Sequence, residues 1–455
     1  MAETPALLDA RYDVFQSDKV DVSSTSQHTS VLTPVNGLEN PGTIQFTVPR
    51  LAIHWMDVCN AYFRVEVQLM KHDAAKGADV PCEATDKAII INNTAHSLFS
   101  DITIRLNERT IEGGNDLYYL RAYLSNLLQY TNDVKNTHMV TQGFTVPQVM
   151  HDTEYDAATK TIKTKAVEFT DKENALNQAI LKQWSDNKFK RTFDFPLKCN
   201  LFQQVIALPP GMQLDLIFTL NKPEYAIYDM EHPAGTTSTK YKFKITSFQL
   251  YMPMLTPNAE LQLKTANRRK TEAIYYRYNG MTVQRQTIES GVQKKTFSNV
   301  AALLSPKLIF FAVVPSNSWF DPGSRKLYFE RHGLSQVTMT TNGAIMTGGT
   351  INCKDDVIAY SQFNRAIQVY NTNESCGIDL ESFTKYCYFI AFDCTLDKQI
   401  DSVQPTNTRQ YGLELQFENT TTQNLDLLMF VIHDEQFSVT PENAVISSAY
   451  IPPAI

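Results

Sequence analysis

The amino-acid sequence predicts an all-β protein built from two sandwiches, with a few short helices in its loops. Many short segments alternate apolar and polar residues, a pattern typical of strands that put one face on a core and the other toward solvent. Proline, glycine and asparagine separate these segments. At 455 residues the chain is longer than one pair of sheets needs, and one segment recurs in the second half.

The first 40 residues differ from the rest of the chain. They are polar, rich in serine and threonine, and show little periodicity. Such a composition offers little apolar surface from which to build a core. We therefore expect an extended arm over residues 1–40, ordered only where it lies on its own or a neighbouring subunit.

The first sandwich is expected over residues 41–258, where strict alternation begins. The alternating runs are Ile44–Val48, Phe63–Leu69, Ile102–Leu106 and Met212–Leu220. In the long run Tyr241–Met252 the phase changes after Ile245, and an odd step of this kind indicates a β-bulge.

The second sandwich is expected over residues 259–455. Two of its segments, Ser305–Pro315 and Tyr386–Leu396, are nearly continuous apolar or aromatic runs. Such runs are typical of strands that are covered on both faces. Further on, Leu413, Leu415 and Phe417 alternate again, and an apolar run follows the turn-like ENTTTQ.

One strand, turn and helix occur twice. SDITIRLNERTIEGG (Ser100–Gly114) and SQVTMTTNGAIMTGG (Ser335–Gly349) share the opening serine, a threonine, the asparagine and the closing Gly-Gly. An amphipathic helical pattern follows each copy, over Leu117–Leu128 after Asp116 and over Val357–Ile367 after Asp356. The matched context favours internal duplication over chance.

The duplication makes a prediction about the core. We expect Ile102, Ile104 and Leu106 to face the core of the first sandwich. Val337 and Met339 should occupy the places in the second sandwich that correspond to the first two of these residues.

A long insertion distinguishes the first half from the second. It covers about residues 136–190, is charged, and contains a second helical pattern over Ala175–Trp184. Insertions of this length belong at one end of a sandwich and are usually functional. We expect Trp184 to pack against a neighbouring loop or subunit.

Charge and cysteine content restrict the class of protein. The net charge of -7 argues against a protein that condenses nucleic acid, because phosphate neutralisation needs clustered lysine and arginine. The one basic run, Arg268–Lys270, is interpreted as a solvated linker rather than a nuclear-import signal. Seven cysteines without a CxxC pair predict reduced, mostly buried thiols and assembly in a reducing compartment. No signal-peptide pattern or membrane-span-length apolar run is present, so we expect no secretion through a signal peptide.

The histidines are weak candidates for chemistry. His54 lies beside no nucleophile motif and is interpreted as structural. His96 and His332 both come shortly before the duplicated strand, which suggests a structural role such as a bond to a turn. His433 and Asp434 are adjacent strand residues and should point to opposite faces.

No catalytic, cofactor-binding or metal-binding residue is predicted. Carboxylate pairs such as Asp355 with Asp356 carry little information among 48 acidic residues. The chain has no glycine-rich nucleotide loop, no HExxH zinc motif and no GxSxG nucleophile motif. We therefore expect a protein that is not an enzyme and that needs no cofactor.

The segment HSLFSDITIRLNERTIEGGNDLYYLRAYLSNLLQYTNDVKNT (His96–Thr137) resembles the signature of a known family. The family is the double jelly-roll major capsid proteins of Polinton (Maverick) elements, adintoviruses and related small DNA viruses. The positions that match are Leu106, Asn107, Tyr119, Arg121 to Leu124, Leu127, Leu128 and Tyr130. Leu308–Gly343 is similar to the family's segment that enters the second roll. Leu120 separates Tyr119 from Arg121, where the family more often has the two adjacent, and the insertion does not align. A virophage or polinton-like virus capsid protein is therefore also compatible with the sequence.

The resemblance implies two tandem eight-stranded jelly rolls and a structural function. Three copies would form a homotrimer with six lobes, whose hexagonal outline tiles an icosahedral shell. The implied partners are neighbouring capsomers and the penton and minor capsid proteins, with no direct sequence-specific binding of nucleic acid. The implied location is the virion, after assembly in the cytoplasm or nucleus of the host cell.

Two other functions fit parts of the sequence. A tandem β-sandwich that binds or cleaves carbohydrate would use some of the 21 tyrosines and 25 phenylalanines as exposed stacking residues. The missing signal peptide disfavours this alternative. A minor capsid or vertex protein with one jelly roll is disfavoured by the chain length and by the repeat.

Overall fold

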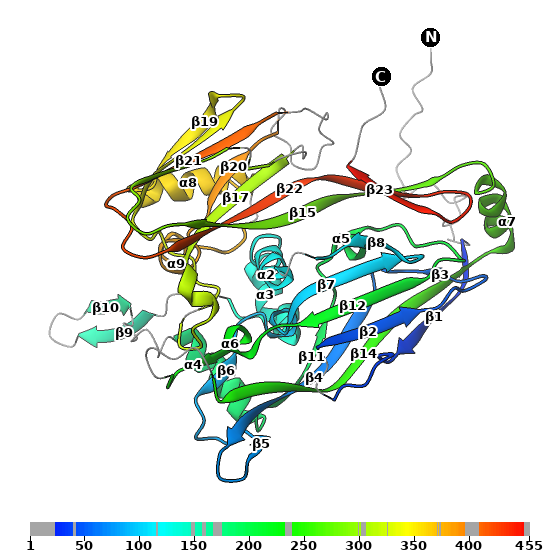
Figure 1. Cartoon of the computed structure of the whole chain (residues 1–455), viewed down its shortest axis with the longest axis horizontal. Helices are drawn as coiled ribbons and strands as arrows, with labels where there is room; N and C mark the ends of the chain where they lie inside the picture. Colours follow the sequence, from blue (N-terminus) through cyan, green and yellow to red (C-terminus); the bar gives the residue numbers. More distant parts are fainter. Residues whose placement is uncertain are drawn as a thin grey trace, which may run out of the picture.

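The computed structural model shows two β-sandwiches, one above the other in Figure 1. It describes residues 23–39, 42–114, 117–146, 151–156, 161–166, 175–232, 239–298, 300–301, 306–324, 326–370, 372, 375–395 and 409–449.

The first sandwich consists of two antiparallel sheets. One has the order β1 (Ser24–Leu32), β14 (Tyr241–Pro257), β4 (Tyr62–Asp73), β11 (Lys190–Phe195), with the short β3 (Trp55–Met56) beside β14 and β5 (Ala78–Pro81) beside β4. The other has the order β2 (Thr43–Val48), β12 (Leu214–Leu220), β7 (Phe99–Leu106), β8 (Arg109–Glu112). The apolar side chains that alternate along β2, β4 and β7 are buried between the two sheets, as their period of two requires.

The second sandwich repeats this arrangement. Its first sheet has the order β15 (Ile274–Ile288), β22 (Leu425–Val439), β17 (Pro306–Pro315), β20 (Ile390–Asp393), with β23 (Val445–Ala449) beside β22. Its second sheet has the order β16 (Lys294–Phe297), β21 (Tyr411–Phe417), β18 (Leu334–Thr341), β19 (Ala344–Asn352).

Both sandwiches are jelly rolls with the same topology. If the eight main strands of each are numbered along the chain, both have one sheet in the order 1-8-3-6 and one in the order 2-7-4-5. The predicted fold class, two tandem eight-stranded jelly rolls, is therefore confirmed.

The duplicated segment is the fourth and fifth strands of each roll. β7 and β8 correspond to β18 and β19, and the helices α2 (Tyr118–Leu128) and α8 (Asp356–Ala366) follow them. All five residues that we expected in the core are 2% exposed or less: Ile102, Ile104, Leu106, Val337 and Met339. The carboxylate that caps α8 belongs to Asp355, one residue before the expected Asp356, and accepts from the backbone N–H groups of Val357 and Ile358. The expected cap of α2, Asp116, lies outside the described residues.

Other sequence patterns also have clear counterparts. The register of β14 shifts against β4 between Ile245 and Ser247, which confirms the predicted bulge. β17 is buried along nearly its whole length, as expected for a strand covered on both faces. All seven cysteines are free, and six are buried while Cys59 is intermediate.

Residues 24–32 of the expected arm belong to a sheet of the first roll. These form β1, which pairs with β14 from Ser24 opposite Pro257 to Leu32 opposite Leu250. β1 has mostly exposed side chains, so it joins the sheet through its backbone and carries no apolar alternation that would reveal it. Helix α7 (Ala259–Arg268) separates the last strand of the first roll from the first strand of the second. We propose that the first jelly roll occupies residues 23–257 and the second residues 274–449.

The insertion contains regular structure. Its described elements are α3 (Asn132–Thr137), η2 (His138–Gln142), β9 (His151–Asp156), β10 (Thr161–Ala166) and α4 (Ala175–Asp186), and β9 pairs with β10. Trp184 in α4 is fully buried within its own chain, with its ring 6.0 Å from that of Phe193 in β11. The expected contact with a neighbouring subunit is therefore wrong for Trp184.

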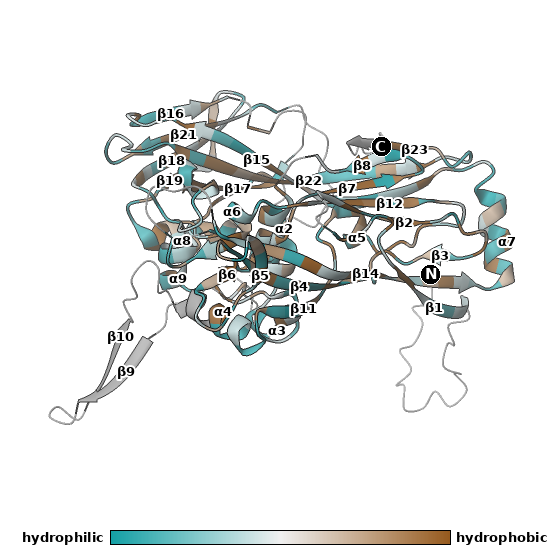
Figure 2. Cartoon of the chain, turned by 60° about the horizontal axis from the view of Figure 1, so that its bottom comes forward, coloured by the Kyte–Doolittle hydropathy of each residue, from teal (hydrophilic) through white to brown (hydrophobic). Residues whose placement is uncertain are grey.

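Short elements complete the two rolls. They are β6 (Ala88–Ile90), which pairs with β13 (Ile227–Asp229), and α1 (Thr94–Ser97), α5 (Asn200–Gln203), α6 (Pro223–Ala226), η3 (Ser316–Trp319) and α9 (Leu380–Tyr386). Figure 2 shows hydrophobic segments along the strands and a largely hydrophilic α7. The buried apolar residues of both rolls belong to one continuous cluster. None of the helices in the described part of the chain has the length and hydropathy of a membrane span.

Candidate functional site

The histidines occupy separate structural environments. His96 is fully buried and lies 2.8 Å from the Tyr118 hydroxyl and 3.0 Å from Oε1 of Gln142, so it joins α1, α2 and η2. Burial lowers the pKa of His96 to about 3, and the ring is neutral at physiological pH. His54 bonds to Thr256, with 3.0 Å between Nδ1 and Oγ1. Burial also lowers the pKa of His332, which has a left-handed backbone with a φ of 47°.

His433 and Asp434 make separate contacts in β22 of the second roll. Nε2 of His433 lies 2.9 Å from the Thr282 hydroxyl. The Asp434 carboxylate lies 2.7 Å from Nζ of the buried Lys307. Within the described ranges, no three His, Cys, Asp or Glu side chains gather as a metal ion would need.

A cluster of buried polar side chains lies at the boundary between the two rolls, which we call the seam. Arg121 of α2 forms an ion pair with Glu112 of β8, and their side chains are only 11% and 12% exposed. The Glu112 carboxylate also accepts from the backbone N–H of Asn200, at 2.8 Å. The Asn200 amide group then donates across the seam to Glu435 of β22, at 2.9 Å. No local sequence pattern indicates this cluster, because its members are far apart in the chain and show no periodicity.

The charges of this cluster are unevenly balanced. Two carboxylates, Glu112 and Glu435, share one guanidinium, Arg121. Burial raises the pKa of Glu112 and the charge of Glu435 raises it further, while Arg121 opposes both effects. Burial also raises the pKa of Glu435, against the effects of Arg121 and Asn200. The bond from Asn200 to Glu435 therefore links the two rolls. Both carboxylates of the cluster have lost part of their contact with water.

Further hydrogen bonds cross the seam on either side of this cluster. Asn107, in the turn between β7 and β8, donates to the backbone carbonyl of Asn443 at 2.8 Å. Asn132 of α3 donates to the Gly377 carbonyl at 3.2 Å. The buried Lys135 donates both to the Leu127 carbonyl of its own roll, at 2.6 Å, and to the Cys376 carbonyl of the other roll.

In the basic run Arg268–Lys270, one arginine faces solvent and the other contacts both rolls. Arg268 is exposed and pairs with Glu272 at 2.6 Å, as a solvated linker would. Arg269 instead donates to the Pro210 carbonyl of the first roll at 3.1 Å and to the side chain of Asn443 in the second. It therefore adds one more bond between the rolls.

Aromatic side chains also pack against one another across the boundary between the two rolls. The rings of Tyr225 and Trp319 stack with their centroids 5.5 Å apart. Tyr123 of α2 lies 6.2 Å from the ring of Phe329. Because polar and apolar contacts both cross the whole boundary, the two rolls pack as one body.

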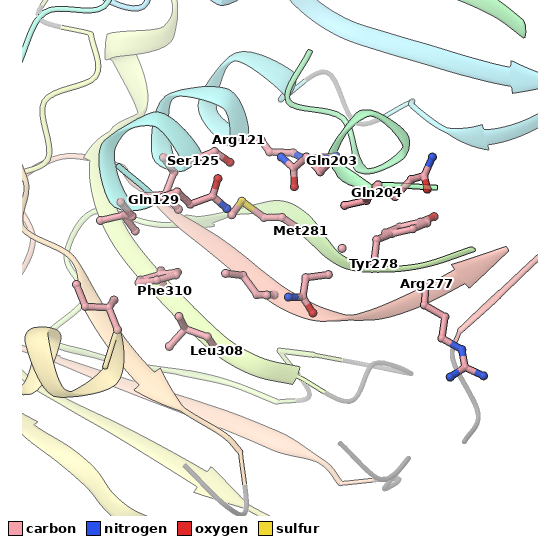
Figure 3. Close-up of a pocket in the computed structure, with 17 residues that line it drawn as sticks. Arg121, Ser125, Gln129, Gln203, Gln204, Arg277, Tyr278, Met281, Leu308 and Phe310 are labelled. Carbon is pink, nitrogen blue, oxygen red and sulfur yellow. The ribbon is translucent and has the colours of Figure 1, made fainter. Parts of the chain in front are cut away.

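A pocket of about 430 Å³ opens at the seam (Figure 3). Arg121 and Ser125 of α2 lie on one side of it, together with Gln129 just after the helix and with Gln203 and Gln204. Residues of the second roll complete its wall, among them Arg277, Tyr278, Met281, Leu308 and Phe310. The lining contains no carboxylate, histidine, cysteine or lysine. It therefore lacks the paired carboxylates that cleave glycosidic bonds.

The exposed aromatic residues do not form a carbohydrate platform. Tyr275, Phe320 and Tyr370 are the described aromatic side chains that are more than half exposed; Tyr275 lies in β15, while Phe320 follows η3 and Tyr370 follows α8. A sugar-binding surface needs such rings beside one another. The structure therefore does not support the carbohydrate alternative.

Comparison with known proteins agrees with this fold. No family model matches the sequence. The chain is 20% identical over 366 residues to an uncharacterized protein of Caenorhabditis elegans, covering 78% of this chain and 80% of that protein.

Similar solved structures come from viruses. A chain of the Sputnik virophage structure has a TM-score of 0.62 at 10% identity, covering 98% of this chain and 93% of that one. The mavirus major capsid protein gives 0.52 at 12% identity, covering 99% and 97%. The Faustovirus major capsid protein gives 0.55 at 10% identity, covering 93% and 92%. These likenesses cover at least 93% of this chain, so its fold of two jelly rolls is shared with these viral structures.

Proposed function

We propose that this chain is a major capsid protein whose activity is self-assembly into an icosahedral shell. One observation carries the proposal: two jelly rolls of identical topology are joined in one chain by a buried seam. Three copies of such a chain present six similar lobes around a three-fold axis. The trimer then has a nearly hexagonal outline, and hexagons tile a flat facet.

The internal structure of the chain suits this function. A shell subunit needs lobes that match in shape and keep a fixed relative position. The shared topology supplies the matching shape, while the Arg121 cluster and the aromatic contacts supply the rigid seam. Surface residues of the two lobes are free to differ, which accounts for the low identity between the duplicated segments.

The two ends of the trimer would have different roles. In Figure 1, β9, β10 and α4 of the insertion lie on the same side of the molecule as α9, and α7 lies at the opposite end. We assign the end with α4 and α9 to the outer surface of the shell. The long insertion of the first roll then supplies the larger part of the trimer's crown.

The proposal includes partners and a location. The partners are neighbouring capsomers and the penton and minor capsid proteins, and the location is the virion after assembly in the host cell. The resemblance of His96–Thr137 to Polinton and adintovirus capsid proteins favours that group of small DNA viruses. The protein would have no enzymatic activity, cofactor or sequence-specific contact with nucleic acid.

Light scattering of the purified chain tests the proposal. We expect an obligate trimer, with three times the chain mass of 51.6 kDa, held by a relatively apolar interface on the order of 2,000 Å² or more. A stable monomer at micromolar concentration would contradict it.

A further inference from the structure

One buried lysine of the second roll has unusual neighbours. The buried lysines of the described residues are Lys135, Lys198, Lys307 and Lys326. Three of them donate to backbone carbonyl groups or to a tyrosine hydroxyl. Lys307 instead contacts two side chains: its Nζ lies 2.7 Å from Oδ1 of Asp434 and 2.9 Å from Oδ1 of Asn279. A buried amine therefore lies beside a carboxylate and a carboxamide at once.

The three side chains come from three neighbouring strands of one sheet. Asn279 of β15 lies directly opposite Asp434 of β22, so these two side chains point to the same face. On the other side of β22, the register of β17 shifts between Pro306 and Leu308, and Lys307 is the extra residue of this bulge. A bulge changes the direction in which a side chain points. Here it lets the lysine reach across β22 to the asparagine on β15.

This arrangement suits attack of an amine on an amide. A lysine amine becomes a nucleophile when an adjacent group accepts its proton, and the Asp434 carboxylate lies within hydrogen-bond reach. The carbon to be attacked, Cγ of Asn279, is bonded to the oxygen that Nζ of Lys307 already contacts. Holding both groups in one geometry removes the entropy cost of bringing them together. Asn279 also lines the pocket at the seam, which gives a released small molecule a path to solvent.

We propose that Lys307 and Asn279 form an intramolecular isopeptide bond, with Asp434 as the group that moves the protons. Asp434 first accepts one proton from the ammonium group of Lys307. The lone pair of Nζ then forms a bond to Cγ of Asn279, and the bond from Cγ to Nδ2 breaks. The proton on Asp434 and a second proton from Nζ pass to Nδ2, which leaves as ammonium. The carboxylate is thereby restored, and the step uses no oxidant, reductant or cofactor.

The bond joins β15 to β17 covalently across β22. Both of these strands line the pocket at the seam, opposite α2 of the first roll (Figure 3). Closing the loop between residues 279 and 307 also restricts the unfolded chain, as a disulfide does. The reaction occurs once in each chain and is therefore not enzyme turnover. It goes beyond the proposed capsid function and does not depend on assembly.

Intact-mass spectrometry of the purified full-length chain is the first measurement. The bond lowers the mass expected from the sequence by one molecule of ammonia. A cyclic imide between Asn279 and the backbone nitrogen of Gly280 would lower it equally, so a trypsin digest must separate the two products. With the isopeptide bond, trypsin does not cut after Lys307, and the peptide that contains this lysine stays joined to Tyr278–Arg285. With the imide, Tyr278–Arg285 is a separate linear peptide.

Three variants complete the test. Asn279→Ala removes the amide that is attacked, and Asp434→Asn removes the proton acceptor with little change in volume. We expect both variants to keep their full sequence mass and to lose the joined peptide. The control is Lys71→Arg, which changes a different lysine–carboxylate pair, Lys71 with Asp86 at 2.9 Å. It should lose ammonia to the same extent as the unchanged chain.

The unchanged chain decides the outcome, so the result does not depend on how well the variants fold. Full sequence mass together with a free Lys307 peptide would overturn the proposal, and so would the cyclic imide. A joined peptide that persists in Asp434→Asn would overturn the role of Asp434. None of these results depends on whether the chain forms trimers, so the capsid proposal is tested separately.

Discussion

Replacing Arg121 with methionine tests whether the seam stabilises the whole chain. The change keeps an apolar stem in place but removes the cation that Glu112 and Glu435 share. Removing one partner of a buried ion pair costs about 3–5 kcal/mol. The entropy of unfolding is about 2.1 cal/mol/K per residue, so for 455 residues this cost lowers the melting temperature by about 3–5 °C.

The defect of Arg121→Met should depend on pH. Burial and the charge of Glu435 already raise the pKa of Glu112. A carboxyl whose pKa is raised in the folded state binds its proton more tightly there than in the unfolded chain. Stability therefore falls as pH rises from the unfolded pKa through the folded one, and losing Arg121 raises the folded pKa further. We expect a larger defect at pH 8 than at pH 5.

Differential scanning calorimetry at pH 5 and pH 8 provides the measurement. The double variant Arg121→Met with Glu112→Gln removes the unpaired charge and should recover part of the lost stability at pH 8. A melting temperature within 1 °C of the unchanged chain at pH 8 would refute the reasoning. A double variant no more stable than the single one would refute it as well.

The remaining predictions concern the core, the first strand, the insertion and the thiols. Ile104→Asp buries an unpaired charge and should abolish soluble expression, whereas the control variant Arg105→Asp, at the neighbouring exposed position, should express normally. Equal yields of the two variants would contradict the core assignment. Deleting residues 1–22 should leave a folded chain by circular dichroism, but deleting residues 1–32 also removes β1 and should cause aggregation, since the edge of β14 loses its partner. Replacing residues 147–174 with a Gly-Ser linker should preserve the melting temperature; a drop of several degrees would show that this part of the insertion stabilises the rolls. Thiol titration of the native chain should modify Cys59 first, with the other six reacting only on unfolding; burial raises the pKa of Cys82 and of Cys353 to about 12.

The sequence predicted the parts of the fold that depend on burial. Alternating apolar residues located β7 and β18, and a change of phase located the bulge in β14, because one face of each strand packs on a core. β1 was missed, since its polar side chains are exposed and only its backbone pairs. Trp184 was identified as a packing residue, but its partner in β11 depends on how the insertion folds back.

The seam could not be predicted from the sequence. Arg121 and Glu435 belong to different rolls, and no local pattern indicates that their charges influence each other. Glu112 could not be told apart from the other acidic residues until the fold brought it beside Arg121. The resemblance of the first helix to a capsid signature pointed to this region, but it did not indicate which charges lie buried there.

Negative-stain electron microscopy of the purified full-length chain tests the central claim most directly. The account predicts discrete particles with a hexagonal outline and three-fold symmetry, or closed shells built from them. Featureless monomers that hydrolyse a glycan substrate would contradict it.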